Sequence, residues 1–214
     1  MPLTAVERPP RAEPHGLLFL HHGRGSDEQD LIELADVLDP AQRLHVVAPR
    51  APLSLTGSPG YHWYLVPRVG HPDPDSFASA YRELADFHDA QFERTGIGPE
   101  RAVLGGFSMG AVMSYALGLG GDRPAPAGIL ALSGFIPTVE GWDPSLEDRH
   151  DQTRVLIAHG RFDMVIPVAF AQRARDVLEQ AGFAVDYRES DAAHHIDPAD
   201  VPRTVGWLER LLAG

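Results

Sequence analysis

The chain has 214 residues, about the size of one globular domain, and 43% of them are hydrophobic, which is enough to form a core. Its net charge of −12, with arginine supplying all 18 basic residues, argues against a nucleic-acid partner, because that binding uses clustered Lys and Arg. The sequence contains no Cys, Lys or Asn, which excludes thiol nucleophiles, thiolate metal sites, Walker phosphate loops and lysine Schiff bases.

The first fifteen residues lack the apolar run of a secretory signal. The longest apolar runs are far shorter than the roughly 18 residues that span a bilayer. We therefore expect a cytoplasmic protein without a membrane span.

Short apolar runs alternate with amphipathic segments along the chain. The runs that predict strands are 16–21, 44–48, 102–106, 127–133, 153–159 and 183–189. Apolar residues at helical spacing predict helices over 31–38, 111–117, 170–181 and 201–212. Ser26 and Gln29 predict a capping box at the start of the first helix, and Gly182 predicts a left-handed cap after the third. This alternation is typical of an α/β fold with a mostly parallel sheet covered on both faces.

One segment, 50–74, breaks the alternation. It is rich in Pro and Gly and carries Tyr61, His62, Trp63 and Tyr64 at its centre. Loops of this length inside a compact domain are usually functional or disordered. The four aromatic rings predict a packed, functional loop.

A serine in the motif G-x-S-x-G is the candidate nucleophile. Ser108 lies between Gly106 and Gly110, after the strand predicted at 102–106 and before the helix predicted at 111–117. A serine on a sharp strand-to-helix turn forms a nucleophile elbow, in which the glycines avoid clashes around a strained backbone. The alternative is a tight turn with an incidental serine.

An acid and a histidine follow in the order that such an elbow requires. Asp163 comes just after the strand predicted at 153–159, and His194 lies on the loop after the next strand. Asp163 alone could be a surface carboxylate, and the pair His194 and His195 alone could be a solvated loop or half of a metal site. Their joint placement favours a triad. Asp186 and Asp191 are weaker candidates for the acid, and His195 remains an alternative base.

The oxyanion hole is assigned to the backbone N–H groups of Arg24 and Met109. Gly23 and Gly25 follow the first predicted strand, and such glycines let backbone amides approach an oxyanion. Met109 directly follows the candidate nucleophile. A glycine turn ahead of a helix is the simpler interpretation of residues 23–25, and it is compatible with this role.

Taken together, these motifs resemble the phospholipase/carboxylesterase family of α/β-hydrolases, which includes acyl-protein thioesterases. The resemblance extends from Gly16 to Leu212. Its marks are His-Gly-Arg-Gly at 22–25, Gly-Phe-Ser-Met-Gly at 106–110, Leu-Ser-Gly at 132–134, the run from His159 to Asp163 continued by Val-Ile-Pro, and His-His-Ile at 194–196.

The resemblance implies a single-domain α/β-hydrolase fold with little or no cap domain, residues 1–14 being an extension and 15–214 the catalytic domain. It also implies a Ser108–His194–Asp163 triad, a small-molecule ester substrate and no metal or organic cofactor, and it allows a homodimer. The sequence departs from the family at Met109, where many relatives have Gln, and in the 50–74 loop. The loop favours a plain esterase over a protein thioesterase.

Apolar residues near these motifs are candidates for the substrate pocket, with core packing as the open alternative. They are Trp63, Tyr64, Phe135, Ile136, Met164 and Val165, together with Gly23. We assign structural hydrogen bonds to three histidines near the site: His21, His22 and His159. Surface or packing roles are assigned to His15, His45, His71, His88 and His150.

The function expected from the sequence is a serine carboxylesterase acting on short- to medium-chain esters through an acyl-enzyme. A lysophospholipase or an acyl-protein thioesterase would use the same triad. A dienelactone hydrolase is less favoured, because those relatives generally use a cysteine nucleophile and this chain has none. A non-catalytic binding module is the remote alternative, since such proteins usually lack a triad member.

Overall fold

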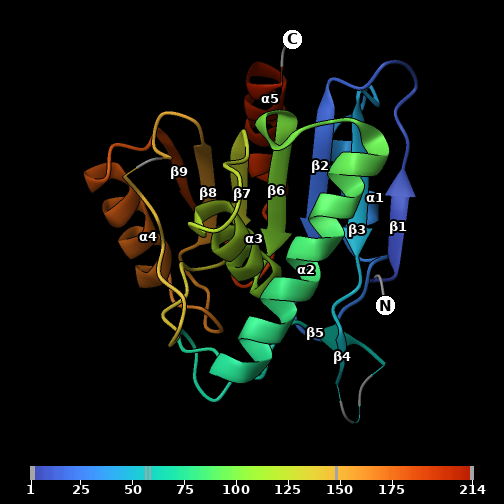
Figure 1. Ribbon diagram of the computed structural model, residues 1–214. Helices are drawn as coiled ribbons and strands as arrows, with labels where there is room; N and C mark the ends of the chain where they lie inside the picture. The colour runs from blue at the N-terminus through green and yellow to red at the C-terminus, as the bar shows by residue number, and fades with distance from the viewer. Residues whose placement is uncertain (1–2, 56, 58, 148, 213–214) are drawn as a thin grey trace.

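A seven-stranded sheet forms the centre of the protein in the computed structural model, which describes residues 3–55, 57, 59–147 and 149–212 (Figure 1). The strand order is β1-β3-β2-β6-β7-β8-β9, and every neighbouring pair is parallel except β1 with β3. The strands are β1 Ala5–Arg8, β2 Gly16–His21, β3 Leu44–Pro49, β6 Ala102–Phe107, β7 Gly128–Leu132, β8 Arg154–Gly160 and β9 Val185–Ser190. The mostly parallel α/β fold expected from the sequence is confirmed.

Helices cover both faces of this sheet (Figure 1). They are α1 Ile32–Leu38, α2 Pro74–Thr95, α3 Met109–Leu119, α4 Ala169–Gln180 and α5 Val201–Leu211, with short 3₁₀ turns η1 Pro99–Arg101 and η2 Pro198–Asp200. The α2, α3 and α4 helices pack on one face, and α1 and α5 pack on the other. Strand β2 shows the reason: Leu17 and Phe19 enter one core cluster, whereas Leu18 and Leu20 enter the other, because side chains alternate across a strand.

The predicted capping box at Ser26 is wrong. Helix α1 begins at Ile32 and has no side-chain cap at its start. Ser26 instead forms an isolated bridge with Tyr61, and its carbonyl accepts the Tyr61 N–H at 2.8 Å. This pairing holds residue 26 in extended backbone, so the chain enters the helix only after a further turn. The cap predicted at Gly182 is present, with a φ of 88° just beyond α4.

Part of the segment 1–14 belongs to the sheet. Residues 5–8 form β1, which pairs antiparallel with β3 at the sheet edge. Arg8 fixes this edge, because its guanidinium bonds the Asp39 carboxylate at 2.6 Å and the Asp39 carbonyl at 3.0 Å. A four-residue, half-buried strand leaves almost no pattern in the sequence. The domain boundary placed at residue 15 from the sequence therefore leaves β1 outside, although β1 is the edge strand of the sheet.

The region between β3 and α3 holds the largest departure from the predicted elements. The 50–74 loop contains a small hairpin, β4 Leu53–Ser54 with β5 Tyr61–His62. The long helix α2 follows and was not predicted. Its signals are nevertheless present: the Asp73 side chain caps the start by accepting the Ser76 N–H at 3.0 Å, and Gly96 ends the helix with a φ of 67°.

Candidate active site

The predicted triad residues lie at one edge of the sheet. Ser108 follows β6, Asp163 follows β8 and His194 follows β9. Because β6, β7, β8 and β9 are parallel neighbours, their carboxyl ends meet at the same edge, at the lower side of the sheet in Figure 1. Residues that are far apart in the sequence are thereby brought together.

The candidate nucleophile sits on a strained turn. Ser108 has a φ of 55° and a ψ of −120°, and α3 begins at the next residue. The glycines on either side permit this turn because there is no space for a side chain. A Cβ on Gly110 would lie 1.9 Å from the His21 carbonyl oxygen, and one on Gly106 would lie 2.4 Å from the carbonyl carbon of Gly110. The geometry is that of the predicted nucleophile elbow.

Ser108, His194 and Asp163 form a continuous hydrogen-bonded chain. The distance from His194 Nε2 to Ser108 Oγ is 2.9 Å, and the distance from His194 Nδ1 to Asp163 Oδ2 is 2.6 Å. Because the carboxylate only accepts, Nδ1 carries the hydrogen and Nε2 is free to accept the serine proton. His194 therefore occupies the base position between the serine and the acid.

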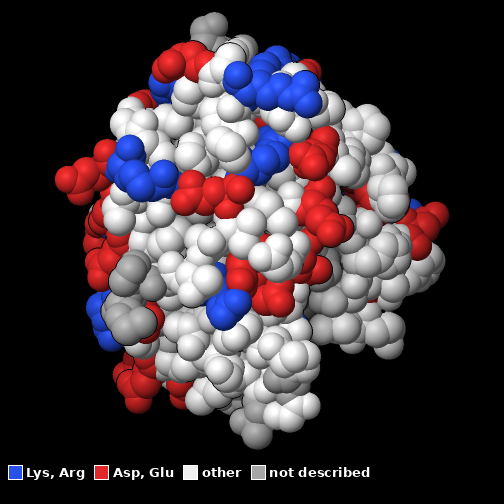
Figure 2. Space-filling view, turned by 90° about the vertical axis from the view of Figure 1, so that its right-hand side faces the viewer, with Lys and Arg blue, Asp and Glu red and all other residues white. Residues whose placement is uncertain are grey.

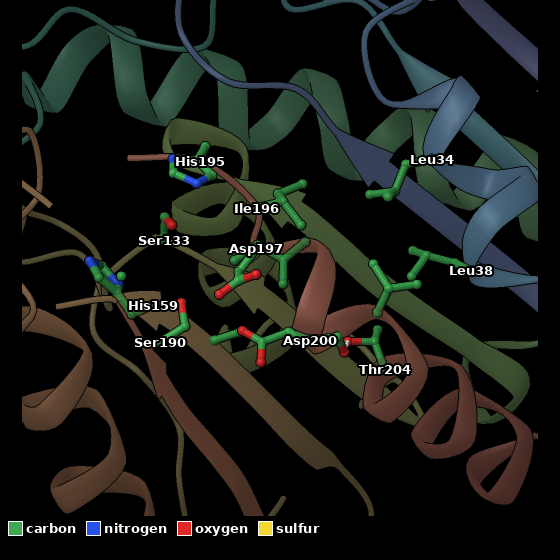
Figure 3. Close-up of a pocket in the computed structure, with 14 residues that line it drawn as sticks. Leu34, Leu38, Ser133, His159, Ser190, His195, Ile196, Asp197, Asp200 and Thr204 are labelled. Atoms are coloured by element: carbon green, nitrogen blue, oxygen red, sulfur yellow. Dashed lines mark hydrogen bonds between the residues drawn. The ribbon is translucent and has the colours of Figure 1, made fainter. Parts of the chain in front are cut away.

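The neighbouring histidine faces elsewhere. His195 lines a small cavity of about 20 Å³ together with Ile196, Asp197 and residues of α1 and α5 (Figure 3). It contacts neither Ser108 nor Asp163 through any hydrogen bond in the described chain. Of the two histidines that the sequence left as alternatives, His194 is the one hydrogen-bonded to both Ser108 and Asp163.

Asp163 is held as an oriented carboxylate. Its side chain is fully buried, and Oδ1 accepts the backbone N–H groups of Val165 and Ile166, each at 2.8 Å. Burial opposes ionisation, but the bonds from the His194 ring and from the Ile166 and Val165 amides outweigh it, so the pKa of Asp163 lies below its usual value. The group is therefore charged at neutral pH and can stabilise a protonated imidazole.

The predicted oxyanion donors lie beside the nucleophile. A Cβ on Gly23 would lie 3.5 Å from Ser108 Cβ, which places the turn of residues 23–25 against the serine. Within the described chain, the Arg24 N–H has no protein acceptor, and Met109 is the first residue of α3, where helix N–H groups lack partners. Both donors are thus free to bind an anionic oxygen near Ser108.

Two of the predicted pocket residues form core instead. Trp63 and Tyr64 have exposed fractions of 0% and 2%, in the cluster beneath the site. Trp63 nevertheless contacts both of the oxyanion segments, that is, residues 22–25 and the start of α3 at Met109, which carry the predicted donors. Its Nε1–H donates to the His22 carbonyl at 2.9 Å, and its backbone N–H lies 3.2 Å from Met109 Sδ. Core packing, the alternative left open, describes these two rings, and the supporting contacts of Trp63 could not be inferred from sequence.

The remaining pocket candidates divide into two groups. Phe135 and Ile136 line a groove of about 490 Å³, together with Phe170 of α4. Met164 and Val165 are exposed, Met164 at 91%, on the loop that carries Asp163. Of the predicted apolar residues, Phe135 and Ile136 are therefore the ones that border a sizeable groove.

Charges on the surface are interspersed. Figure 2 shows arginine side chains next to acidic ones over the face that carries β1, and Arg8–Asp39, Arg43–Glu209 and Arg94–Glu7 are ion pairs. No cluster of three or more His, Asp or Glu suited to a metal ion occurs among the described residues. None of the helices in the described ranges is long and apolar enough to cross a membrane.

Known proteins are similar to this chain in sequence or in structure. Acyl-protein thioesterase 1 of Yarrowia lipolytica is 26% identical over 222 residues, which cover 97% of each chain. The structure of esterase PE8 matches with a TM-score of 0.80 and 28% identity, over 99% of this chain and 100% of that one. A carboxylesterase of Bacillus cereus shares the fold, with a TM-score of 0.82 and 22% identity over 98% and 94% of the two chains.

The sequence profile of one family extends over almost the same range. It is described as Phospholipase/Carboxylesterase and matches residues 2–209. Since the match spans nearly the whole chain, from β1 into α5, the protein belongs to the phospholipase/carboxylesterase family of ester hydrolases.

Proposed function

We propose that the protein is a serine carboxylesterase that hydrolyses short- to medium-chain esters. The observation that carries this proposal is the hydrogen-bonded chain from Ser108 Oγ through His194 to Asp163, at 2.9 and 2.6 Å. Such a chain activates a serine hydroxyl for attack on a carbonyl carbon. Family membership supports the same reaction class.

The first half of the reaction forms an acyl-enzyme. Ser108 Oγ bonds to the ester carbonyl carbon while its proton passes to His194 Nε2, and the carbonyl electron pair moves to oxygen. The N–H groups of Arg24 and Met109 bind this oxyanion, each worth about 3–4 kcal/mol by comparison with measured donors. The C–O bond to the alcohol then breaks, and His194 returns the proton to the leaving oxygen.

The second half releases the acid. A water molecule gives a proton to His194 Nε2 as its oxygen bonds to the acyl carbon. Collapse of the second oxyanion breaks the bond to Ser108 Oγ, which regains the proton from His194. The charged Asp163 stabilises the imidazolium in both halves.

The groove beside Phe135 and Ile136 is the proposed acyl site. Phe135, which lines the groove, follows Gly134, where a Cβ would lie 3.3 Å from the Ser108 carbonyl oxygen, so the chain at this end of the groove packs against the backbone of the proposed nucleophile. Its volume of about 490 Å³ lies in the usual range of small-molecule pockets. Close to it, a Cβ on Gly70 would lie 2.8 Å from the Phe170 ring, so the loop packs tightly against α4 there.

A p-nitrophenyl ester series from acetate to palmitate, with wild type and Ser108→Ala in parallel, tests this proposal. We expect the best rates between C2 and C8 and a loss of about 10⁴-fold or more in the variant. Equal rates in the two proteins would contradict the triad.

Acyl-protein thioesterase activity is the second candidate, because curated relatives such as the Yarrowia lipolytica protein carry that name. A preference for C12–C16 chains, together with hydrolysis of a palmitoylated peptide thioester, would favour it. The triad assignment is common to both candidates, so this comparison decides the substrate and not the chemistry.

A further inference from the structure

A second buried histidine lies against the acid of the candidate triad. His159, near the end of β8, has a side chain with no exposed surface. Its Nε2 is 2.8 Å from the Ile166 carbonyl oxygen and 3.3 Å from Asp163 Oδ2. The triad mechanism makes no use of this ring, yet the ring touches the carboxylate that orients His194.

The partners of the ring define its tautomer. The Ile166 carbonyl only accepts, so Nε2 of His159 carries the hydrogen. Nδ1 is buried and has no partner in the described ranges, and a second hydrogen there would be an unpaired buried donor. Burial lowers the pKa of His159; the bond to the Ile166 carbonyl and the charges of Asp163 and of Glu189 on β9 oppose this, a protonated His194 adds to it, and the net pKa is lowered. The ring therefore stays neutral.

The neutral ring completes a closed set of contacts around Asp163. The Ile166 N–H donates to Asp163 Oδ1, while the Ile166 carbonyl accepts from His159 Nε2, which lies beside Asp163 Oδ2. Oδ1 is thus bonded to the turn that connects β8 to α4, and Oδ2, which binds His194 Nδ1, has the His159 ring beside it. A charged partner here would compete with His194 for the carboxylate, whereas a neutral ring that donates to the Ile166 carbonyl fixes the turn without competing.

We propose that His159 is a positioning residue: as a neutral donor to the Ile166 carbonyl, it holds the turn that orients the Asp163 carboxylate toward His194. This inference rests on the triad of the proposed function. Without His159, the Asp163 turn loses the donor that binds its Ile166 carbonyl. The carboxylate also loses the neighbouring ring dipole near Oδ2, so its interaction with His194 should change.

The test compares His159→Leu with His159→Gln, since a glutamine amide can still donate to the Ile166 carbonyl. In His159→Leu we expect kcat to fall about 10- to 100-fold with KM within a factor of about 2, as for a misplaced catalytic group. The acid-side midpoint of its pH–rate profile should move by at least about half a unit from that of wild type. His159→Gln should recover kcat to within about threefold of wild type.

Leu156→Ala is the matched control, because Leu156 is buried on the same strand but belongs to the core on the opposite face. It should lower the thermal midpoint and leave the pH–rate profile in place. The proton resonance of the His194 Nδ1–H gives a readout that needs no turnover: it should shift in His159→Leu and stay in Leu156→Ala.

Fluorophosphonate labelling of Ser108 distinguishes a failure of the proposed function from a failure of the proposed role of His159. If wild type is not labelled and Ser108→Ala keeps its activity, the proposed function fails. If Ser108 is labelled but His159→Leu shows the profile, kcat and resonance of the Leu156→Ala control, only the role of His159 is overturned. That role is also overturned if His159→Leu does not fold and His159→Gln loses as much kcat as a variant of the base.

Discussion

Acidification from pH 7 to pH 5 is expected to destabilise the fold through a buried pair of histidines. His21 Nε2 lies 3.1 Å from His88 Nε2, and His21 Nδ1 lies 2.8 Å from Ser114 Oγ. The Ser114 hydroxyl donates its one hydrogen to the Gly110 carbonyl, so His21 donates through Nδ1 and accepts from His88. Both rings are neutral in this arrangement, which ties β2, α2 and α3 together.

The size of the stability loss follows from proton linkage. Burial lowers the pKa of His21 from 6.5 to about 3, and burial, followed by the nearby His21 and Arg123, lowers the pKa of His88 well below 6.5. Below pH 6.5, and above the lowered pKa of each ring, the unfolded chain binds protons that the folded chain does not. The free energy of unfolding therefore falls as pH falls below 6.5. At about 1.4 kcal/mol per pH unit for each ring, reaching pH 5 removes about 2 kcal/mol per histidine.

Urea unfolding followed by tryptophan fluorescence at pH 7, 6 and 5 measures this loss. We expect wild type to lose about 4 kcal/mol from the pair, and the buried His22 and His159, whose pKa values are also lowered, should add to it. Carboxylates with lowered pKa values, such as Asp163, act in the same direction but at lower pH. Between pH 7 and pH 5, the loss of stability therefore comes from the histidines and not from the carboxylates.

The variant His88→Gln removes one titrating ring while keeping a side-chain donor for His21. Its stability should fall by about 2 kcal/mol less than that of wild type over the same pH range. The exposed His15→Gln serves as a control and should reproduce the wild-type slope. An equal slope in wild type and His88→Gln, or a wild-type loss below about 1 kcal/mol, would refute the linkage argument.

Three further predictions concern the elbow and its supports. Gly110→Ala should destabilise the fold by at least about 3 kcal/mol in urea unfolding, because its Cβ would meet the His21 carbonyl at 1.9 Å; a stable variant would show that the turn can open. Met109→Gln should keep kcat/KM on p-nitrophenyl butyrate within about threefold, since only the backbone N–H is used; a large loss would assign a role to the thioether. Trp63→Phe should cost about 1–3 kcal/mol through the unpaired His22 carbonyl and should lower kcat more than it raises KM; unchanged kinetics would separate this bond from the oxyanion segments.

Much of the fold could be predicted because parallel strands are buried on both faces. Such strands are nearly continuous apolar runs, and β2 is buried at every position. The candidate triad could be placed for the same reason: Ser108, Asp163 and His194 each follow a strand, and the strand ends share one edge.

The rest depends on contacts that a linear pattern does not carry. Edge strand β1 is short and half-buried, so its residues show no clear alternation. The true start of α1 depends on the pairing of Ser26 with Tyr61, which is a tertiary contact. The sequence places Trp63 in a loop, but the contact of its indole with the His22 carbonyl is decided by packing. Helix α2 is the exception, since Asp73 and Gly96 mark its ends in the sequence.

The conformation of Ser108 sets stability and activity against each other. At a φ of 55° a side chain carries strain of about 1–3 kcal/mol, which glycine would avoid. Ser108→Gly is thus a substitution that relaxes the backbone and removes the proposed nucleophile in a single step. Selection of variants for thermal stability alone would therefore favour glycine at position 108 and yield folded but inactive protein. A screen that preserves the enzyme has to select for turnover at the same time.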